Sequence, residues 1–138
     1  MTTSTITTSF TRAISDALLG MAKAPVKIQQ IQVSGTSTGN TTTDIYQVPA
    51  GFYFILQESD IYIESGGAED YAQLYYTDSA NNIIMQLNVQ QGVGLSANVT
   101  YTNGIFVNET EKIRLKSGTD NTNKALIIGY LLPVSYFQ

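Results

Sequence analysis

The chain has 138 residues, which is enough for one domain with a buried core but short for two. Its 11 acidic and 7 basic residues give a formal net charge of −4, and no basic stripe is present to neutralise phosphates, which argues against a nucleic-acid partner. The absence of cysteine and histidine rules out disulfides and thiolate ligands and removes the commonest general base. We therefore expect no catalytic residues, no cofactor and a protein that is not an enzyme.

Residues 1–25 are expected to form a flexible N-terminal arm ahead of a main domain at 26–138. Apolar residues in the arm recur at three- and four-residue spacing, which predicts one short amphipathic helix over about residues 9–22. Ser9 is a suitable N-cap, and Pro25 closes the segment. A helix this short is marginally stable alone in water, so its apolar stripe is expected to pack on another surface. The stripe consists of Phe10, Ile14, Leu18 and Met21.

The arm has no basic region followed by an apolar core, so we expect no secretory signal. No apolar run approaches the roughly 20 residues that a transmembrane helix requires, so we expect no transmembrane segment. The predicted helix carries Asp16 as well as Arg12 and Lys23. Its polar face is therefore not the basic one that binds anionic lipids, and we expect no membrane partner.

From residue 26 onward the apolar residues recur with a period of two, which is typical of β-strands. The predicted strands are 26–33, 44–48, 52–64, 71–78, 82–89, 99–109, 111–117 and 124–132. The sequence thus predicts an all-β fold, an antiparallel two-sheet sandwich of about eight strands that is jelly-roll-like. We expect a loop at 34–43, a hairpin connection at 79–82 and a hairpin turn at the Asn103-Gly104 pair.

The strand at 52–64 carries apolar residues on both faces. Phe52, Phe54 and Leu56 occupy even positions, whereas Ile61 and Ile63 occupy odd positions, and the two sets point to opposite faces of a regular strand. Two arrangements fit this pattern. A β-bulge or bend between Gln57 and Asp60 would switch the face and turn both sets into one core. Alternatively, the strand runs straight, and Phe52 and Phe54 face outward into a contact.

Apolar residues also occupy both faces of the strand at 124–132 and the C-terminal tail. Burying one large apolar side chain is worth about 1.5–3 kcal/mol, so a soluble monomer seldom leaves this much apolar surface in water. We expect the predicted helix and another subunit of a homo-oligomer to cover it. The alternative is a monomer in which the helix alone covers one sheet. The candidate interface residues are Phe10, Ile14, Leu18, Met21, Phe52, Phe54, Tyr136 and Phe137.

Three further groups of side chains each allow a binding role and a structural one. The acidic residues lack the spacing of a calcium loop, so solvated side chains are favoured over a weak calcium site; they are Glu58, Asp60, Glu64, Glu69 and Asp70. Four tyrosines offer rings for carbohydrate stacking, but the lack of tryptophan and the high β-propensity of tyrosine favour cross-strand packing; they are Tyr71, Tyr75, Tyr76 and Tyr101. The basic residues Lys112, Arg114 and Lys116 are expected to form a solvated strand face.

Two long stretches carry a recognisable pattern: "VPAGFYFILQESDIYIES" at 48–65 and "VNETEKIRLKSGTDNTNKALIIGYLL" at 107–132. Both stretches resemble small β-sandwich proteins of tailed-phage and other virus particles. The resemblance implies a structural protein of the virion, such as a decoration or cement protein, a head-fibre base or a head–tail component. It also implies a trimer, capsid or tail proteins as partners, and no catalytic residues. The alternative function is a carbohydrate-binding or receptor-binding β-sandwich module.

Overall fold

The computed structural model describes residues 28–66, 71–118 and 121–137. The elements are β1 (Gln29–Thr38), β2 (Thr42–Gln47), β3 (Phe52–Ser65), β4 (Tyr71–Thr77), β5 (Ile83–Gln91), β6 (Ser96–Val107), β7 (Lys112–Ser117), β8 (Thr122–Pro133) and the 3-10 turn η1 (Val134–Phe137). The arm and its predicted helix lie outside the described residues. Within the described ranges, no helix has the length and apolar character needed to cross a bilayer.

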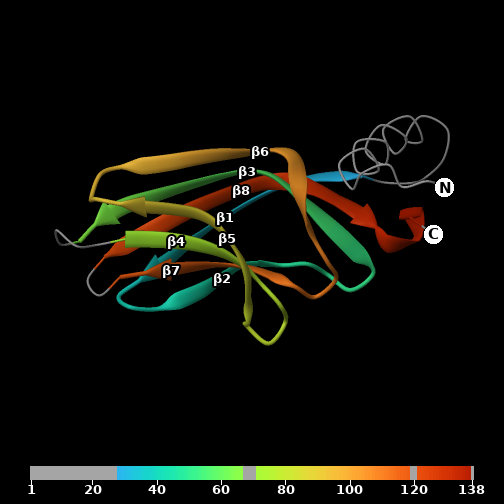
Figure 1. Ribbon diagram of the computed structural model, residues 1–138, viewed down its shortest axis with the longest axis horizontal. Coiled ribbons are helices and arrows are strands. Elements are labelled where there is room, and N and C mark those ends of the chain that lie inside the picture. Colours follow the sequence, from blue (N-terminus) through green and yellow to red (C-terminus); the bar gives the residue numbers. More distant parts are fainter. Residues whose placement is uncertain (1–27, 67–70, 119–120, 138) are drawn as a thin grey trace.

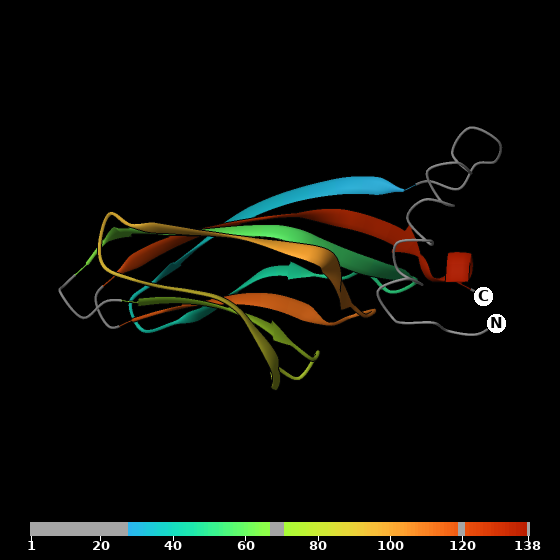
Figure 2. The ribbon, with the colours of Figure 1, turned by 45° about the horizontal axis from the view of Figure 1, so that its top comes forward.

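The strands form two four-stranded sheets that pack face to face (Figures 1 and 2). The first sheet has the order β1-β8-β3-β6 and the second β2-β7-β4-β5. Each strand in the first half of the chain pairs antiparallel with the strand at the mirror position in the second half: β1 with β8, β2 with β7, β3 with β6 and β4 with β5. Eight strands wound in this manner form a jelly roll. The predicted antiparallel two-sheet sandwich is confirmed.

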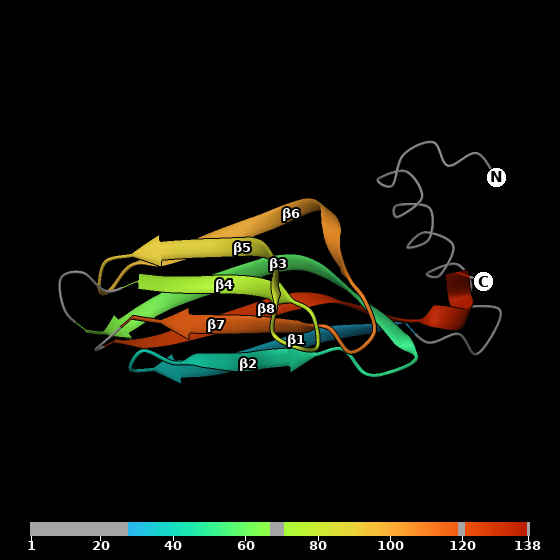
Figure 3. The same ribbon diagram turned by 60° about the horizontal axis from the view of Figure 1, so that its bottom comes forward.

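The chain crosses from one sheet to the other at every connection except the β4–β5 hairpin, which lies where the sequence predicted one. This winding places β5 and β6, which are consecutive in sequence, at the edges of the two sheets on one flank of the sandwich (Figure 3). β1 and β2 are the edge strands of the opposite flank. Each flank therefore exposes two edge strands that come from adjacent parts of the sequence.

Two of the predicted loops are corrected by the structure. Residues 34–38, expected to be part of a loop, continue β1, because Gly35 lets β1 approach the second sheet closely: a Cβ atom there would lie 2.5 Å from Cδ1 of Ile45. The Asn103-Gly104 pair forms no hairpin but a bend inside the unbroken strand β6, where Gly104 has a φ of 74°. The residues on both sides of this bend pair with β3, so no second strand is available for a hairpin.

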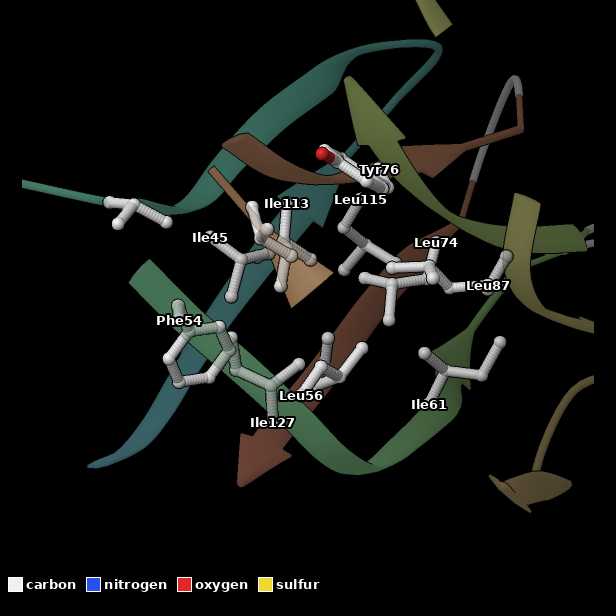
Figure 4. Close-up of a cluster of buried hydrophobic side chains, with 14 of the residues drawn as sticks. Ile45, Phe54, Leu56, Ile61, Leu74, Tyr76, Leu87, Ile113, Leu115 and Ile127 are labelled. Atoms are coloured by element: carbon white, nitrogen blue, oxygen red, sulfur yellow. The ribbon is translucent and has the colours of Figure 1, made fainter. Parts of the chain in front are cut away.

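The strand β3 bends at a bulge, as the first of the two arrangements predicts. Its register with both β6 and β8 shifts between Leu56 and Glu58. Residues on even positions before the bulge and on odd positions after it point into the same core (Figure 4). Phe54, Leu56, Ile61 and Ile63 are all 0% exposed. The straight-strand arrangement, in which Phe52 and Phe54 face outward, is wrong.

Gly129 of β8 lies opposite Leu56, next to the bulge. A Cβ atom on Gly129 would overlap the carbonyl oxygen of Ile55 and lie 2.6 Å from the ring of Phe54. The side chains of Ile55 and Phe54 are fully buried, so neither residue can move aside into solvent. Glycine is therefore required here by the close approach of β8 to the bulged part of β3.

The substitution Gly129→Ala is expected to lower the free energy of unfolding by about 1–3 kcal/mol, the usual cost of overpacking a core. Urea unfolding followed by circular dichroism measures this change. The control is Ser34→Ala at an exposed position of the neighbouring strand β1, which should change stability by less than about 0.5 kcal/mol. An unchanged unfolding midpoint for Gly129→Ala would contradict the packing at the bulge.

Candidate functional site

The predicted interface residues separate into three groups in the structure. Phe54 is fully buried between the sheets, with its ring centroid 5.1 Å from that of Tyr46, so it is removed from the candidate interface. Phe52 is half-buried and packs against the same core. Tyr136 is half-buried in η1. The remaining predictions concern side chains outside the described ones, namely those of Phe10, Ile14, Leu18, Met21 and Phe137.

A second, smaller apolar cluster covers the outer face of the first sheet at the end where β1 begins. Its buried members are Ile28, Ile55 and Leu132, and Phe106, Tyr130 and Tyr136 pack against them. Ile55 reaches this cluster because it points away from the main core, between its neighbours Phe106 on β6 and Tyr130 on β8. The chain's own residues thus contribute to covering the second face of β3 at this end.

The exposed apolar surface lies mainly elsewhere, on β5 and the loop that follows it. In the part of the chain that the structure describes, seven large hydrophobic side chains are exposed, and six of them fall within residues 83–95. We call these six residues the β5 flank: Ile83, Ile84, Met85, Val89, Val93 and Leu95. Ile83 is the most exposed of them, at 61%. The outer residues of β8, where the sequence predicted surplus apolar surface, are half-buried or buried instead, apart from Lys124.

Irregular pairing with β4 explains why β5 turns so many apolar residues outward. Nine residues of β5 lie alongside seven of β4, and the register shifts twice, between Leu74 and Tyr75 and between Tyr76 and Thr77. These bulges break the alternation of faces, so that Leu87 and Asn88 are both buried while the first four residues are all exposed. This surface was not among the predictions from the sequence. One signal was available, because no charged residue occurs between Asp78 and Glu109.

A buried polar network fastens β5 to the first sheet. The Asn88 amide donates to Ser59 Oγ at 3.1 Å and to the carbonyl oxygen of Ala97 at 3.0 Å. The Tyr101 hydroxyl donates to the carbonyl oxygen of Leu87 at 2.8 Å and lies 2.9 Å from Ser59 Oγ. Burial raises the pKa of Tyr101, against the lowering effect of its hydrogen bond with Ser59. The network joins strands of both sheets and fixes the position of β5 on this flank.

The hairpin that leads into β5 is held by Asp78. Its Oδ1 accepts hydrogen bonds from the backbone N–H of Ala80 at 2.8 Å and of Asn82 at 2.9 Å, and its Oδ2 accepts one from the Asn82 amide. Hydrogen bonds from Asn82 lower the pKa of Asp78. Lys112 of β7 donates to Asn81 Oδ1 at 3.0 Å, which ties the turn to the second sheet. The exposed start of β5 therefore follows a well-ordered turn.

Of the acidic residues considered as a calcium site, Glu58 and Asp60 come together, but both bind Asn98, and Glu64 pairs with a lysine instead. Asn98 donates to both Glu58 and Asp60, at 2.7 and 2.9 Å, and Lys124 pairs with Glu64 at 2.9 Å. Nowhere in the described ranges do three or more metal-ligating side chains gather. The remaining candidates, Glu69 and Asp70, lie outside them.

The basic side chains of the second sheet contact neighbouring side chains of that sheet. Asp44 pairs with Lys112 at 3.3 Å and with Arg114 at 2.6 Å, and Lys116 lies 5.9 Å from the centre of the Tyr71 ring. Desolvation raises the pKa of Asp44, but its bonds to these two cations outweigh that effect and lower it overall.

The four tyrosines do not form one row. Tyr76 is buried and donates to Glu111 at 2.6 Å, and Tyr101 belongs to the interior network. Tyr71 and Tyr75 are half-buried on the opposite face of β4. Only these two of the four candidate rings therefore lie on the outer surface of the second sheet.

Removing the Tyr101 hydroxyl tests the network that holds β5. Tyr101→Phe is expected to lower the free energy of unfolding by about 1–3 kcal/mol, because the Leu87 carbonyl loses its side-chain partner in the interior. Tyr75→Phe is the control: its hydroxyl bonds only Gln73 of the same strand, and the change should stay within about 0.5 kcal/mol. Equal denaturation midpoints for both variants would contradict a stabilising role for the network.

No family model matches the sequence, and no curated protein is similar to it. Among the solved structures that share the fold are two with a TM-score of 0.50. One is a chain of Bacillus endospore appendages, which are described as disulfide-linked pili; it is 13% identical, with 80% of this chain and 91% of that chain covered and a TM-score of 0.50. Another is a chain of the acidic stable capsid of Helicobacter pylori bacteriophage KHP30, 10% identical over 78% and 94% of the two chains, with a TM-score of 0.50. The β-sandwich fold implied by the resemblance to virion proteins is the fold observed.

Proposed function

We propose that the protein is a non-enzymatic structural subunit of a virus particle. The observation that carries this proposal is the single jelly roll, which shares its fold with a phage capsid chain and a pilus chain over most of its length. Both of those proteins belong to extended assemblies of subunits. The sequence supports the absence of catalysis, since it contains no histidine and no cysteine.

The finer role is that of a decoration, cement or fibre-base protein on a capsid or tail. The subunit would be located in the virion and form a homo-oligomer, for which the sequence resemblance favours a trimer. Other capsid or tail proteins would be its partners, and the N-terminal arm would be the docking element. Ile28, the first described residue, belongs to the outer apolar cluster, so docking at that end would not disturb the main core.

A carbohydrate-binding or receptor-binding module is the second candidate. The half-buried rings of Tyr71 and Tyr75 on the outer face of β4, with Gln73 between them, favour it. Lys116 over the Tyr71 ring competes with a sugar for that surface. Glycan-array binding that disappears in a Tyr71→Ala, Tyr75→Ala variant would support this candidate over a purely structural role.

Deleting residues 1–25 tests the docking role of the arm. The truncated protein keeps Ile28 and the whole sandwich, so it should fold, with the far-ultraviolet circular dichroism of a β-sheet protein and a cooperative unfolding transition, but fail to join particles. Density-gradient sedimentation of particles assembled with either protein measures incorporation. The full-length chain is the control. Full incorporation of the truncated protein would overturn the docking role, and failure of the full-length chain to join any particle would overturn the virion role.

A further inference from the structure

We propose that the β5 flank is the surface through which a second copy of this chain binds, with the β5 edges of the two copies pairing antiparallel about a two-fold axis. This inference rests on the homo-oligomer in the proposed function and names its contact. It differs from the trimer implied by the resemblance, because a two-fold contact gives an even number of copies.

The first support is the concentration of apolar side chains. Six of the seven exposed large hydrophobic residues among the described ones lie on the β5 flank. Ile83, Ile84 and Met85 are consecutive and are 61%, 51% and 44% exposed. Single exposed hydrophobic residues need no explanation, but a contiguous group is typical of a binding surface.

The second support is the open edge of the strand. β5 ends the order β2-β7-β4-β5, so among the described residues no strand pairs with its outer side (Figure 3). Edge strands of soluble proteins are usually protected by lysine, proline or inward-pointing charges. β5 has none of these, since its sequence is IIMQLNVQQ. Its bulges lie against β4 and turn apolar residues outward, so they do not protect the edge.

The lack of charged residues on β5 favours a second copy of the chain over a charged partner. No residue between Asp78 and Glu109 is charged, and this range includes all of β5, β6 and the loop between them. Two copies that each carry a net charge of −4 repel one another, but β5 itself carries no charge, so two β5 edges can pair without a carboxylate on either strand. A strongly charged partner would find no opposite charge there. The flank is complementary to an uncharged apolar edge, and the same flank of another copy provides one.

The size and order of the flank fit such a contact. Nine residues of β5 span about 30 Å at ~3.3 Å per residue. On the side of a two-layer sandwich, a strip of that length offers on the order of the ~800 Å² that each partner contributes to a standard interface. The Asn88–Tyr101 network and the Asp78 turn hold β5 in place before binding, which reduces the ordering that association requires.

The mass of the full-length chain in solution, measured by light scattering at several concentrations, tests the contact. The variant Ile83→Glu with Met85→Glu places two carboxylates on the β5 flank, and we expect it to weaken self-association at least tenfold. The matched control is Gln30→Glu with Gln32→Glu, which adds the same charge to exposed positions of the edge strand β1 and should leave the mass unchanged. Circular dichroism confirms that both variants are folded.

The absence of cysteine allows a second, independent measurement. In single-cysteine variants at Ile83, Met85, Val89 and Gln91, a disulfide-linked dimer should form under mild oxidation only at positions near the two-fold axis, where paired Cα atoms lie within about 7 Å. Gln32→Cys on β1 is the control and should remain monomeric in denaturing gels.

The outcomes separate this inference from the proposed function. An oligomer with an even number of copies that is weakened by the β5 glutamates and cross-linked along β5 supports the contact. A trimer overturns the contact but still supports the homo-oligomer. The same holds for any oligomer whose mass is unchanged by the β5 glutamates and that forms no disulfide between β5 strands. A chain that is monomeric at every concentration overturns both the contact and the homo-oligomer. Cross-linking of β5 to another virion protein in particles, with no self-cross-link, overturns the second copy as the partner while supporting the virion role.

Discussion

The whole sandwich depends on β3. This strand supplies one core with apolar residues from even positions in its first half and from odd positions in its second half. A regular strand would direct Phe54 and Leu56 to one face and Ile61 and Ile63 to the other. The bulge between Leu56 and Glu58 reverses the faces, so all four enter the space between the sheets. The neighbouring strand β8 is constrained as a result: it needs a glycine at 129, because its backbone approaches that of β3 too closely for any side chain.

Nested pairing then determines what each flank of the molecule presents. Because β4 pairs with β5 and β3 with β6, the middle of the chain forms one flank, with the edges of both sheets side by side. Residues 79–108, which include the edge strands β5 and β6, carry no charge, whereas charged side chains on other strands form pairs such as Asp44 with Arg114 and Glu64 with Lys124. Interior hydrogen bonds of Asn88 and Tyr101 hold this uncharged flank in place. An ordered, uncharged edge is the surface that the proposed contact between two copies uses.

Much of the fold follows from local patterns. The alternation of apolar residues predicted the positions of the strands. Within β3 the apolar residues change from even to odd positions, which left two possible arrangements of the strand, and the bulged one is observed. Predictions failed where a local signal competed with distant contacts. The Asn103-Gly104 pair favours a hairpin, yet residues on both sides of it pair with β3, and the pair becomes a bend within β6. The polar residues 34–38 resemble a loop, yet they pair with β8 and continue β1.

The class of fold, the absence of histidine and cysteine chemistry, and the apolar residues on both faces of β3 all follow from the amino-acid sequence, because each depends on composition or on the period of a single segment. Which apolar residues remain exposed follows only from the packing of the strands. Phe54 was predicted to lie at a contact but is buried, while Ile83, Ile84 and Met85, predicted only to lie in a strand, are on an open edge. The physical reason is that exposure depends on which strand ends a sheet and on bulges set by the neighbouring strand, and neither is encoded in the segment itself.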